Sequence, residues 1–306
     1  MRRGLMKHIY FVVLATLFAF SSYGSADSLT LHFYPSPHGI NWSSPQRLTF
    51  STAINLVTKK DKGYRRIIGH ASIELQCDAT QDREAVHIWR GASSAFGTQL
   101  SDRLRTDKYG LGILFYNLDG RFEKNRNLEE KTELRLMKGR NSFIEYAISP
   151  ETCKRLHEYS LEYEEREYWR HYGLPNRPRH GEGAGCTAFV VSYLSLAGIL
   201  EPEYYDGWSK SVRVPLRLIG GHYTDRKVSI FRLLTTSLDW AKEHEAHYPL
   251  FFWDPDAMHR WVKRVHKNDG VVGNLKFEPV RYFASKGLRL DVRDAPTPTD
   301  PFFHED

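Results

Sequence analysis

The sequence is poor in cysteine and in long apolar segments. Its 306 residues include three cysteines, too few for a scaffold that disulfides hold together. The mean hydropathy is −0.52, and a single segment, at the N-terminus, is apolar enough to meet a membrane. Internal repeats are absent. These absences exclude a collagen, a coiled coil and a polytopic membrane protein, whereas 41% hydrophobic residues allow a packed core.

The N-terminal segment has the pattern of a secretory signal peptide. Arg2, Arg3 and Lys7 are basic, residues 9–20 are apolar, and the small residues 21–26 follow. The apolar run would span about 18 Å as a helix, short of the roughly 30 Å hydrocarbon core of a bilayer. We therefore expect cleavage after Ala26, no stable membrane anchor afterwards, and a periplasmic or secreted protein.

The charge balance gives little support to nucleic-acid binding. Without residues 1–26 the chain has 40 basic and 37 acidic residues, a net charge of +3, because the removed segment holds three basic and no acidic residues. No basic run with interleaved aromatic residues stands out. A mixed, solvated surface explains these charges, and we expect no nucleic-acid partner.

The three cysteines are Cys77, Cys153 and Cys186. In an oxidising compartment two of them can pair and leave one over. The surroundings of Cys186 suggest that it is the odd one. A Cys77–Cys153 disulfide is consistent with this, but spacing alone leaves open that both are buried thiols.

Alternating apolar residues and turn signals predict an antiparallel sheet in the first half of the chain. The clearest pair is a hairpin, since residues 66–76 and 85–90 flank a polar turn. The strands expected from these patterns are residues 29–34, 66–76, 85–90, 110–117 and 140–148.

Two helices are well marked. Ser149 and Pro150 form a helix start, with serine as the cap and proline at the first position, and this helix should run to about residue 171. Residues 186–197 form the most apolar helix of the chain, closed by Gly198, and should be central. The remaining predictions are a strand at 212–219, a strand running into a helix at 228–240, a helix at 257–267 and a loose tail at 295–306.

The sharpest local feature is the sequence Gly-Glu-Gly-Ala-Gly-Cys at residues 181–186. It places Cys186 at the start of an apolar helix, where backbone N–H groups favour a thiolate and can bind an oxyanion. The three glycines indicate that something approaches the backbone closely. A buried cysteine that merely begins a core helix is the alternative.

A cysteine nucleophile needs a base, and two histidines lie on the predicted hairpin. His70 precedes an alternating strand, and His87 lies on the strand paired with it. Side chains alternate along strands, so the two can share a face. One could then act as the base for Cys186 while the other orients its ring.

This arrangement resembles the circularly permuted papain-like group, the permuted NlpC/P60 superfamily that includes the lecithin:retinol acyltransferase-like proteins. The resemblance implies Cys186 as nucleophile, His70 as base and His87 as the orienting residue, without a cofactor. It implies an α+β fold in which an antiparallel sheet packs on the cysteine helix. We expect the core at residues 27–200, with an inserted helical segment at about 100–180, and a C-terminal extension at 201–306.

Other residues compete for these roles. His222 follows the cysteine and would be the base in the unpermuted order of the superfamily. Glu74 shares a strand face with His70 and is a weaker candidate for the third group. His180 lies near Cys186 in sequence but in a loop.

A metal site has weak support. Asp254, Asp256 and His259 could suggest one, but Asp-Pro-Asp before a helix is more often a turn and a cap. No zinc or calcium signature is present.

The function expected from these features is an exported thiol-dependent hydrolase that cleaves an amide or ester through an acyl-enzyme. A peptide or glycopeptide of the cell envelope, such as a peptidoglycan peptide, is the first substrate class. A lipid or thioester acyltransferase or esterase is the second possibility. A non-enzymatic envelope binding or scaffolding protein is the third.

Overall fold

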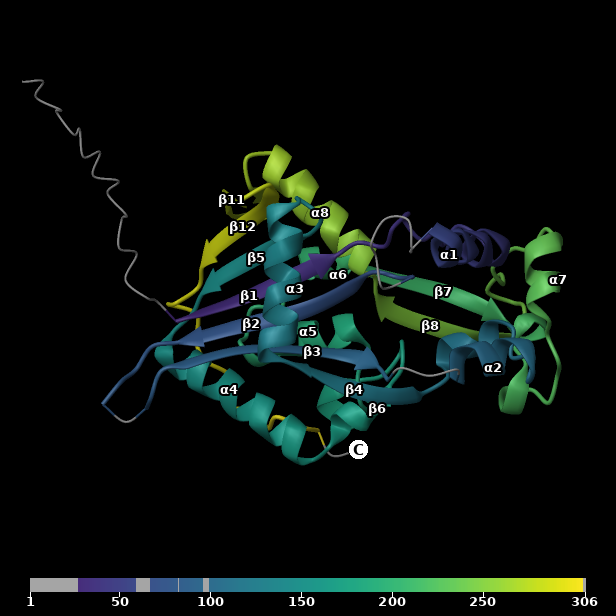
Figure 1. Ribbon diagram of the computed structural model, residues 1–306, viewed down its shortest axis with the longest axis horizontal. Helices are drawn as coiled ribbons and strands as arrows, with labels where there is room; N and C mark the ends of the chain where they lie inside the picture. Colours follow the sequence, from purple (N-terminus) through teal and green to yellow (C-terminus); the bar gives the residue numbers. More distant parts are fainter. Residues whose placement is uncertain (1–26, 59–66, 82, 96–98, 305–306) are drawn as a thin grey trace, which may run out of the picture.

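An eight-stranded sheet forms the larger part of the molecule (Figure 1). The computed structural model describes residues 27–58, 67–81, 83–95 and 99–304. The strand order is β11-β12-β5-β1-β2-β3-β4-β6, and every neighbouring pair is antiparallel except β12 and β5. The strands are β1 (Ser28–Tyr34), β2 (His70–Cys77), β3 (Val86–Ser94), β4 (Leu118–Lys124), β5 (Ser142–Ala147), β6 (His171–Tyr172), β11 (Glu278–Tyr282) and β12 (Ser285–Asp291). The predicted α+β class with a mainly antiparallel sheet is confirmed.

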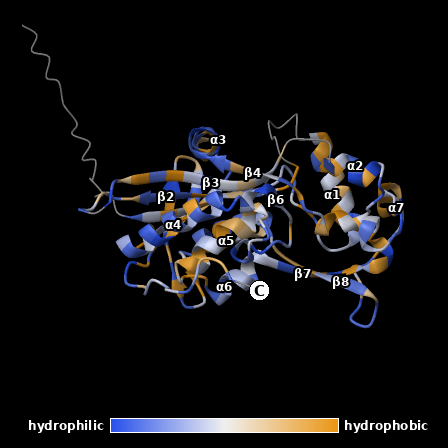
Figure 2. Cartoon of the chain, turned by 90° about the horizontal axis from the view of Figure 1, so that it is seen from below, coloured by the Kyte–Doolittle hydropathy of each residue, from blue (hydrophilic) through white to orange (hydrophobic). Residues whose placement is uncertain are grey.

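Helices cover the sheet unequally on its two sides (Figures 1 and 2). Helix α3 (Asn125–Met137) lies on one face, against β3 and β4. The other face carries α4, α5 and α8, with α6 packed on α8. These helices are α4 (Pro150–Glu165), α5 (Cys186–Leu196), α6 (Pro202–Trp208) and α8 (Pro255–Lys267).

The alternation of side chains decides which face is the core. Leu31 pairs with Ile73, and both are fully buried in the cluster that includes Phe189 and Val190 of α5. The intervening residues of β2 point to the α3 side, since directly paired and alternate residues share a face. The apolar residues of β1 and β2 therefore fix α5 as the central helix, as its sequence predicts.

A second, smaller lobe extends from one end of the sheet, on the right of Figure 1. Its core is a separate cluster that includes Val214, Leu218, Leu250 and Phe252. The lobe contains α1 (Pro45–Thr58), α2 (Gln99–Arg105), α7 (Ile230–Thr235), β7 (Ser209–Pro215), β8 (His247–Trp253) and a 3-10 turn (Leu111–Phe115). A short hairpin, β9 (Val271–Val272) and β10 (Leu275–Lys276), follows α8.

Several sequence predictions are confirmed. Strands β2 and β3 form the predicted antiparallel hairpin, and β1 and β5 lie where strands were expected. The Ser149 hydroxyl accepts a hydrogen bond from the Thr152 amide, so it caps α4 as predicted. This helix ends earlier than expected, at Glu165, because Glu167 adopts a left-handed conformation with φ 56°.

Other predictions are wrong. Residues 110–117 form a 3-10 turn instead of a strand, since Gly110 has φ 53° and Leu111 is buried in the second core. Of the strand running into a helix expected at 228–240, the helix is present as α7, which Ser229 caps, but the described residues form no strand before it. The tail at 295–304 is packed rather than loose, because Phe302 and Phe303 contact the ring of Tyr159.

The segment at 201–306 does more than pack on a core at 27–200. It supplies β11 and β12 to the sheet, α8 to its face, and β7 and β8 to the second lobe. The segment at about 100–180, expected to be a helical insertion, also contains β4 and β5 of the sheet.

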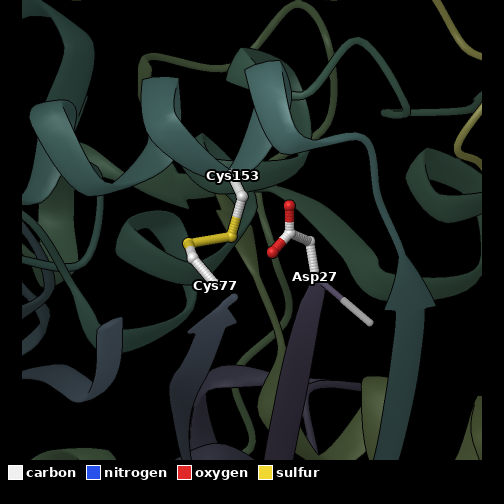
Figure 3. Close-up of side chains that lie close together, drawn as sticks. All are labelled: Asp27, Cys77 and Cys153. Atoms are coloured by element: carbon white, nitrogen blue, oxygen red, sulfur yellow. A yellow bond between two sulfur atoms is a disulfide. The ribbon is translucent and has the colours of Figure 1, made fainter. Parts of the chain in front are cut away.

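A disulfide joins Cys77 at the end of β2 to Cys153 in α4 (Figure 3). Both residues are buried, and Asp27 lies beside them. Its carboxylate accepts a hydrogen bond of 2.6 Å from the Asp78 amide. The pairing that the sequence left open is therefore present, and Cys186 is the cysteine outside it.

The predicted signal segment at 1–26 lies outside the described residues. Within those residues, no helix has both the length and the apolar character needed to cross a bilayer.

Removing the disulfide should destabilise the fold, because the bond closes a loop with a sequence separation of 76 residues. We expect the Cys77→Ala/Cys153→Ala variant to lose about 2–5 kcal/mol of unfolding free energy in urea titrations. Dithiothreitol should destabilise the oxidised wild type similarly and leave the variant unchanged. A variant as stable as the oxidised wild type would contradict the assignment.

Candidate active site

Cys186 is the first residue of α5 and is buried, with 5% of its surface exposed. The residue before it, Gly185, gives the helix no side-chain cap. The first turn is held by a 2.7 Å hydrogen bond from the Thr187 hydroxyl to the Trp253 carbonyl. The thiol thus lies at a helix N-terminus whose first amides are not occupied by a capping side chain.

The glycine loop before the thiol is packed closely against its own chain. Gly183 has φ 84°, and a Cβ atom there would lie 2.1 Å from the carbonyl oxygen of His171. The Ala184 amide donates a 3.1 Å hydrogen bond to that same oxygen. The close approach that the glycines indicate is therefore made by strand β6.

His70 is the first residue of β2 and belongs to a buried acid–imidazole pair. Its Nε2 lies 2.7 Å from Oε2 of Glu123 on β4, and both side chains are at most 6% exposed. The ring stacks on Tyr34 with centroids 5.7 Å apart. Gly91 of β3 lies between the two strands, and a Cβ there would come within 3.3 Å of Oε2 of Glu123.

Sequence reasoning missed Glu123. The relevant strand is β4, which the sequence pattern placed eight residues too early, at 110–117. The alternation in the correct strand puts Phe122 in the core and Glu123 on the opposite face. That alternation is the signal that could have revealed the residue.

The α3 side of the sheet carries the imidazole. Tyr34 pairs with His70 in the register of β1 and β2. The Tyr34 hydroxyl is 2.8 Å from the Ser72 hydroxyl and 2.5 Å from that of Thr132 in α3. Helix α5, by contrast, packs on the opposite face of β2 and β3.

The segments that carry the thiol and the imidazole nevertheless meet at one end of the sheet. Gly69 lies against Pro255, since a Cβ atom there would be 2.9 Å from the proline ring. The Thr187 hydroxyl of α5 donates a hydrogen bond to the carbonyl of Trp253, which precedes Pro255 by two residues. At this end of the sheet, Nε2 of His70 has Glu123 as its hydrogen-bond partner.

The prediction that His87 orients His70 is wrong. His87 pairs in register with Gln76, six residues along β2 from His70, which is roughly 20 Å at about 3.3 Å per residue. Glu123 occupies the position that His87 was expected to fill.

Glu74 shares the face of His70, as predicted, but binds two other histidines. Its Oε1 lies 2.8 Å from Nε2 of His87, and its Oε2 lies 3.3 Å from Nε2 of His32. His32 is buried and stacks on Trp89. Glu74 is therefore not a third group for His70.

The remaining competitors lie elsewhere. His222 is exposed in the second lobe, where its Nδ1 is 2.9 Å from the Tyr109 hydroxyl. His180 ends a short 3-10 turn, with its ring beside that of His304. His222 thus belongs to the second lobe, whereas the turn that ends at His180 packs against α5.

The acidic segment at residues 254–256 is a turn and a cap, as expected. Asp254 accepts a 2.9 Å hydrogen bond from the Asp256 amide and caps α8. Burial and the nearby Lys263 lower the pKa of His259 to about 4, and its Nδ1 is 2.9 Å from the Ser142 hydroxyl. These three residues do not form a cluster of metal ligands in the described chain.

One group of metal-ligating residue types does gather in the described ranges, namely Asp27, Cys77 and Cys153 (Figure 3). Both sulfur atoms are committed to the disulfide. A disulfide sulfur is not a thiolate, which is the form that binds metal ions. The group therefore does not fit a metal site.

Comparison with protein-family models, with curated proteins and with solved structures found no match to this chain.

Stability in acid should depend on Glu74. Burial alone would raise its pKa, but hydrogen bonds with His32 and His87 and their charge bring the pKa below its usual value. A carboxyl whose pKa is lower in the folded protein than in the unfolded chain stabilises the fold at pH values above its unfolded pKa, which is about 4.3 for glutamate. This stabilisation is lost as the pH falls through the pKa of the folded protein. The wild type should therefore lose unfolding free energy below about pH 4, and the Glu74→Gln variant should lose less over the same pH range. Urea titrations at several pH values measure both.

Glu130→Gln is the matched control, because Glu130 is an exposed residue on α3, with 60% of its side chain accessible. Its acid dependence should follow the wild type. Identical acid dependence of Glu74→Gln and the wild type would refute the role of the Glu74 cluster.

Proposed function

We propose that the protein is an exported thiol-dependent hydrolase with a permuted papain-like core, in which Cys186 is the nucleophile and His70 the base. One observation carries the proposal. The buried pair of His70 and Glu123 lies at the end of the sheet where the residues 253–255 also hold the first turn of α5. That turn carries the one cysteine outside the disulfide.

The acid–imidazole pair has the form that a general base requires. Glu123 binds Nε2 of His70, which fixes the orientation and tautomer of the ring. Nδ1 is then the nitrogen that takes the proton of the thiol. Glu123 therefore replaces His87 as the orienting residue of the expected triad.

The helix N-terminus supports the other half of the reaction. The positive end of the α5 dipole favours a thiolate at Cys186. Because Gly185 has no side chain to cap the helix, the first amides can also donate to an oxyanion.

The proposed reaction has two steps. The thiolate attacks the carbonyl carbon, a carbon–sulfur bond forms, and the amide or ester bond breaks while His70 gives its proton to the leaving group. Water, deprotonated by His70, then attacks the thioester and releases the acid and the thiol.

An envelope peptide or glycopeptide, such as a peptidoglycan peptide, is the proposed substrate class. The signal-like segment at 1–26 supports export, and the disulfide between Cys77 and Cys153 fits an oxidising compartment. A lipid or thioester acyl substrate would use the same acyl-enzyme and is the second enzymatic proposal.

A non-enzymatic binding protein is the second candidate function. It is favoured by the placement of α5 on the sheet face opposite to His70. In that case Cys186 is a core residue, and the pair of His70 and Glu123 is a buried structural contact.

Alkylation of the thiol separates the two proposals. We expect iodoacetamide to modify Cys186 with an apparent thiol pKa at least about one unit below the ordinary 8.5. His70→Ala should abolish that activation, and Glu123→Gln should weaken it because the ring loses its anchor. The rate of alkylation against pH, followed by mass spectrometry, gives the result.

The matched control is His87→Ala, which changes a histidine on the same hairpin and should behave as the wild type. Cys186→Ala should take up no label, since the other two sulfur atoms are in the disulfide. Slow labelling that His70→Ala leaves unchanged would exclude the hydrolase and support the binding protein.

A further inference from the structure

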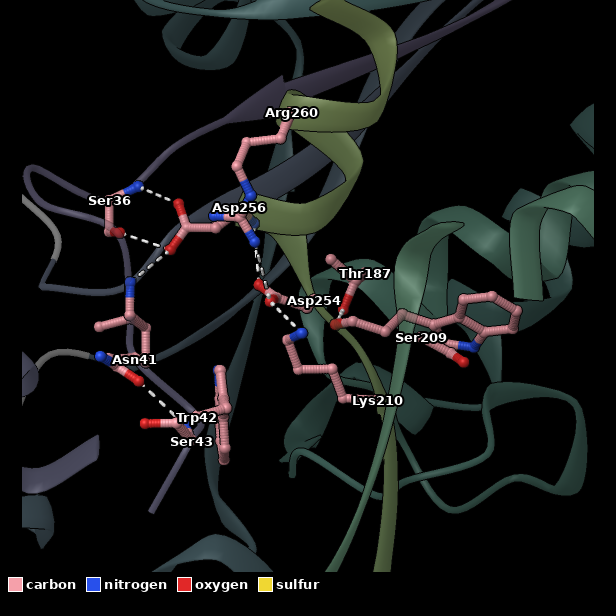
Figure 4. A network of polar contacts seen from close by, with 12 residues as sticks. Ser36, Asn41, Trp42, Ser43, Thr187, Ser209, Lys210, Asp254, Asp256 and Arg260 are labelled. Atoms are coloured by element: carbon pink, nitrogen blue, oxygen red, sulfur yellow. Dashed lines mark hydrogen bonds and ion pairs between the residues drawn. The ribbon is translucent and has the colours of Figure 1, made fainter. Parts of the chain in front are cut away.

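A cavity of about 600 Å³ opens where the loop from β1 to α1, strand β7 and helix α8 meet. The loop residues 39–43 form one wall, with the ring of Trp42 packed against Phe252. The start of β7 and Arg260 of α8 form the rest. Figure 4 places the charged side chains of this region beside one another. The cavity therefore lies between the second lobe and the helices that cover one face of the sheet.

Two cations line this cavity, and each is paired with one acid, Asp254. Nζ of Lys210 lies 3.7 Å from Oδ2 of Asp254, and a guanidinium nitrogen of Arg260 lies 3.8 Å from the same oxygen. Both distances are those of ion pairs and exceed hydrogen-bond length. Among the hydrogen bonds of the described residues, neither cation is a donor. Their side chains are 30% and 54% exposed, so their N–H groups are accessible from the cavity.

The acids in this region lie behind the wall. Asp256 is 2% exposed and is already bound by the amides of Ser36 and Ile40 and by the Ser36 hydroxyl. Asp254 is equally buried, and its Oδ2 has no hydrogen-bond partner among the described residues.

Asp254 and the two cations depend on each other. Burial and the neighbouring Asp256 raise the pKa of Asp254, and the charges of Lys210 and Arg260 oppose that rise. One buried carboxylate thus holds both cations at the cavity wall. Asp254 is a positioning residue here, while the partly exposed side chains of the two cations stay accessible.

We propose that this cavity is a binding site for an oxyanion of a ligand, a carboxylate or a phosphate, held between Lys210 and Arg260. A guanidinium offers paired donors that match either group, and an ammonium adds a point charge. The hydroxyls of Ser43 and Ser211 line the same cavity and supply further donors. The site does not depend on the hydrolase proposal, because none of its residues takes part in that chemistry.

Binding of small oxyanions tests the site directly. Isothermal titration of the full chain uses inorganic phosphate and N-acetylglycine as probes, with chloride at equal ionic strength as the reference. We expect saturable binding in the wild type, weakened at least about tenfold in Lys210→Met and in Arg260→Met, since each variant loses a charged hydrogen-bond donor to the oxyanion.

Arg264→Met is the matched control, because Arg264 is an exposed arginine one turn further along α8. It should bind as the wild type does. Arg260→Lys keeps the charge next to Asp254 and should keep part of the affinity, which separates loss of the site from loss of folding. Thermal melting of each variant checks that it is folded.

The stronger of the two small probes identifies the oxyanion. If phosphate binds more strongly, sedimentation with vesicles of equal parts phosphatidylcholine and phosphatidylglycerol distinguishes a lipid headgroup from a soluble phosphate. Vesicle binding that Arg260→Met abolishes supports the headgroup, and its absence supports a soluble ligand. No saturable binding by either probe, or equal binding in both cation variants, overturns the proposal.

Discussion

The buried carboxylate of Asp256 joins parts of the chain that lie about 220 residues apart. It accepts hydrogen bonds from the Ser36 amide at 2.7 Å and from the Ile40 amide at 3.1 Å. These bonds tie the segment after β1 to the first turn of α8 and so connect the sheet to the second lobe. The wall of the cavity beside Arg260 and the end of the sheet with Gly69 and Pro255 both adjoin this connection. Burying a polar group costs free energy unless it is hydrogen-bonded, and these bonds supply partners to both oxygen atoms of Asp256.

The sequence predicts the elements whose signals are local. The alternation in β2, the cap at Ser149 and the apolar run of α5 each appear within a few residues, and each is confirmed. Strand β4 was misplaced because the apolar run at 110–117 has the composition of a strand, whereas the positive φ of Gly110 and the second core impose a turn. The parallel pairing of β12 with β5 has no local signal, since it depends on contacts 144 residues apart.

In the candidate site, too, the sequence predicts what local signals specify and misses what depends on contacts between distant segments. The residues around Cys186 correctly indicated that it begins a buried helix and lies outside the disulfide. Spacing could not give the register of the hairpin, which separates His87 from His70 by most of the strand length. Glu123 takes the place beside His70 because Gly91 leaves room for a contact across β3, a fact about packing rather than sequence order. The catalytic roles of Cys186 and His70 stay predictions.

The parallel pairing of β12 with β5 also determines when the molecule can finish folding. Ser142 pairs with Lys286, so the edge of β5 stays open until nearly the whole chain is available. Pairing over so long a loop is slow, and an unpaired strand edge invites association with other chains. For a chain synthesised from its N-terminus, this topology delays closure of the sheet until nearly the whole chain has been made.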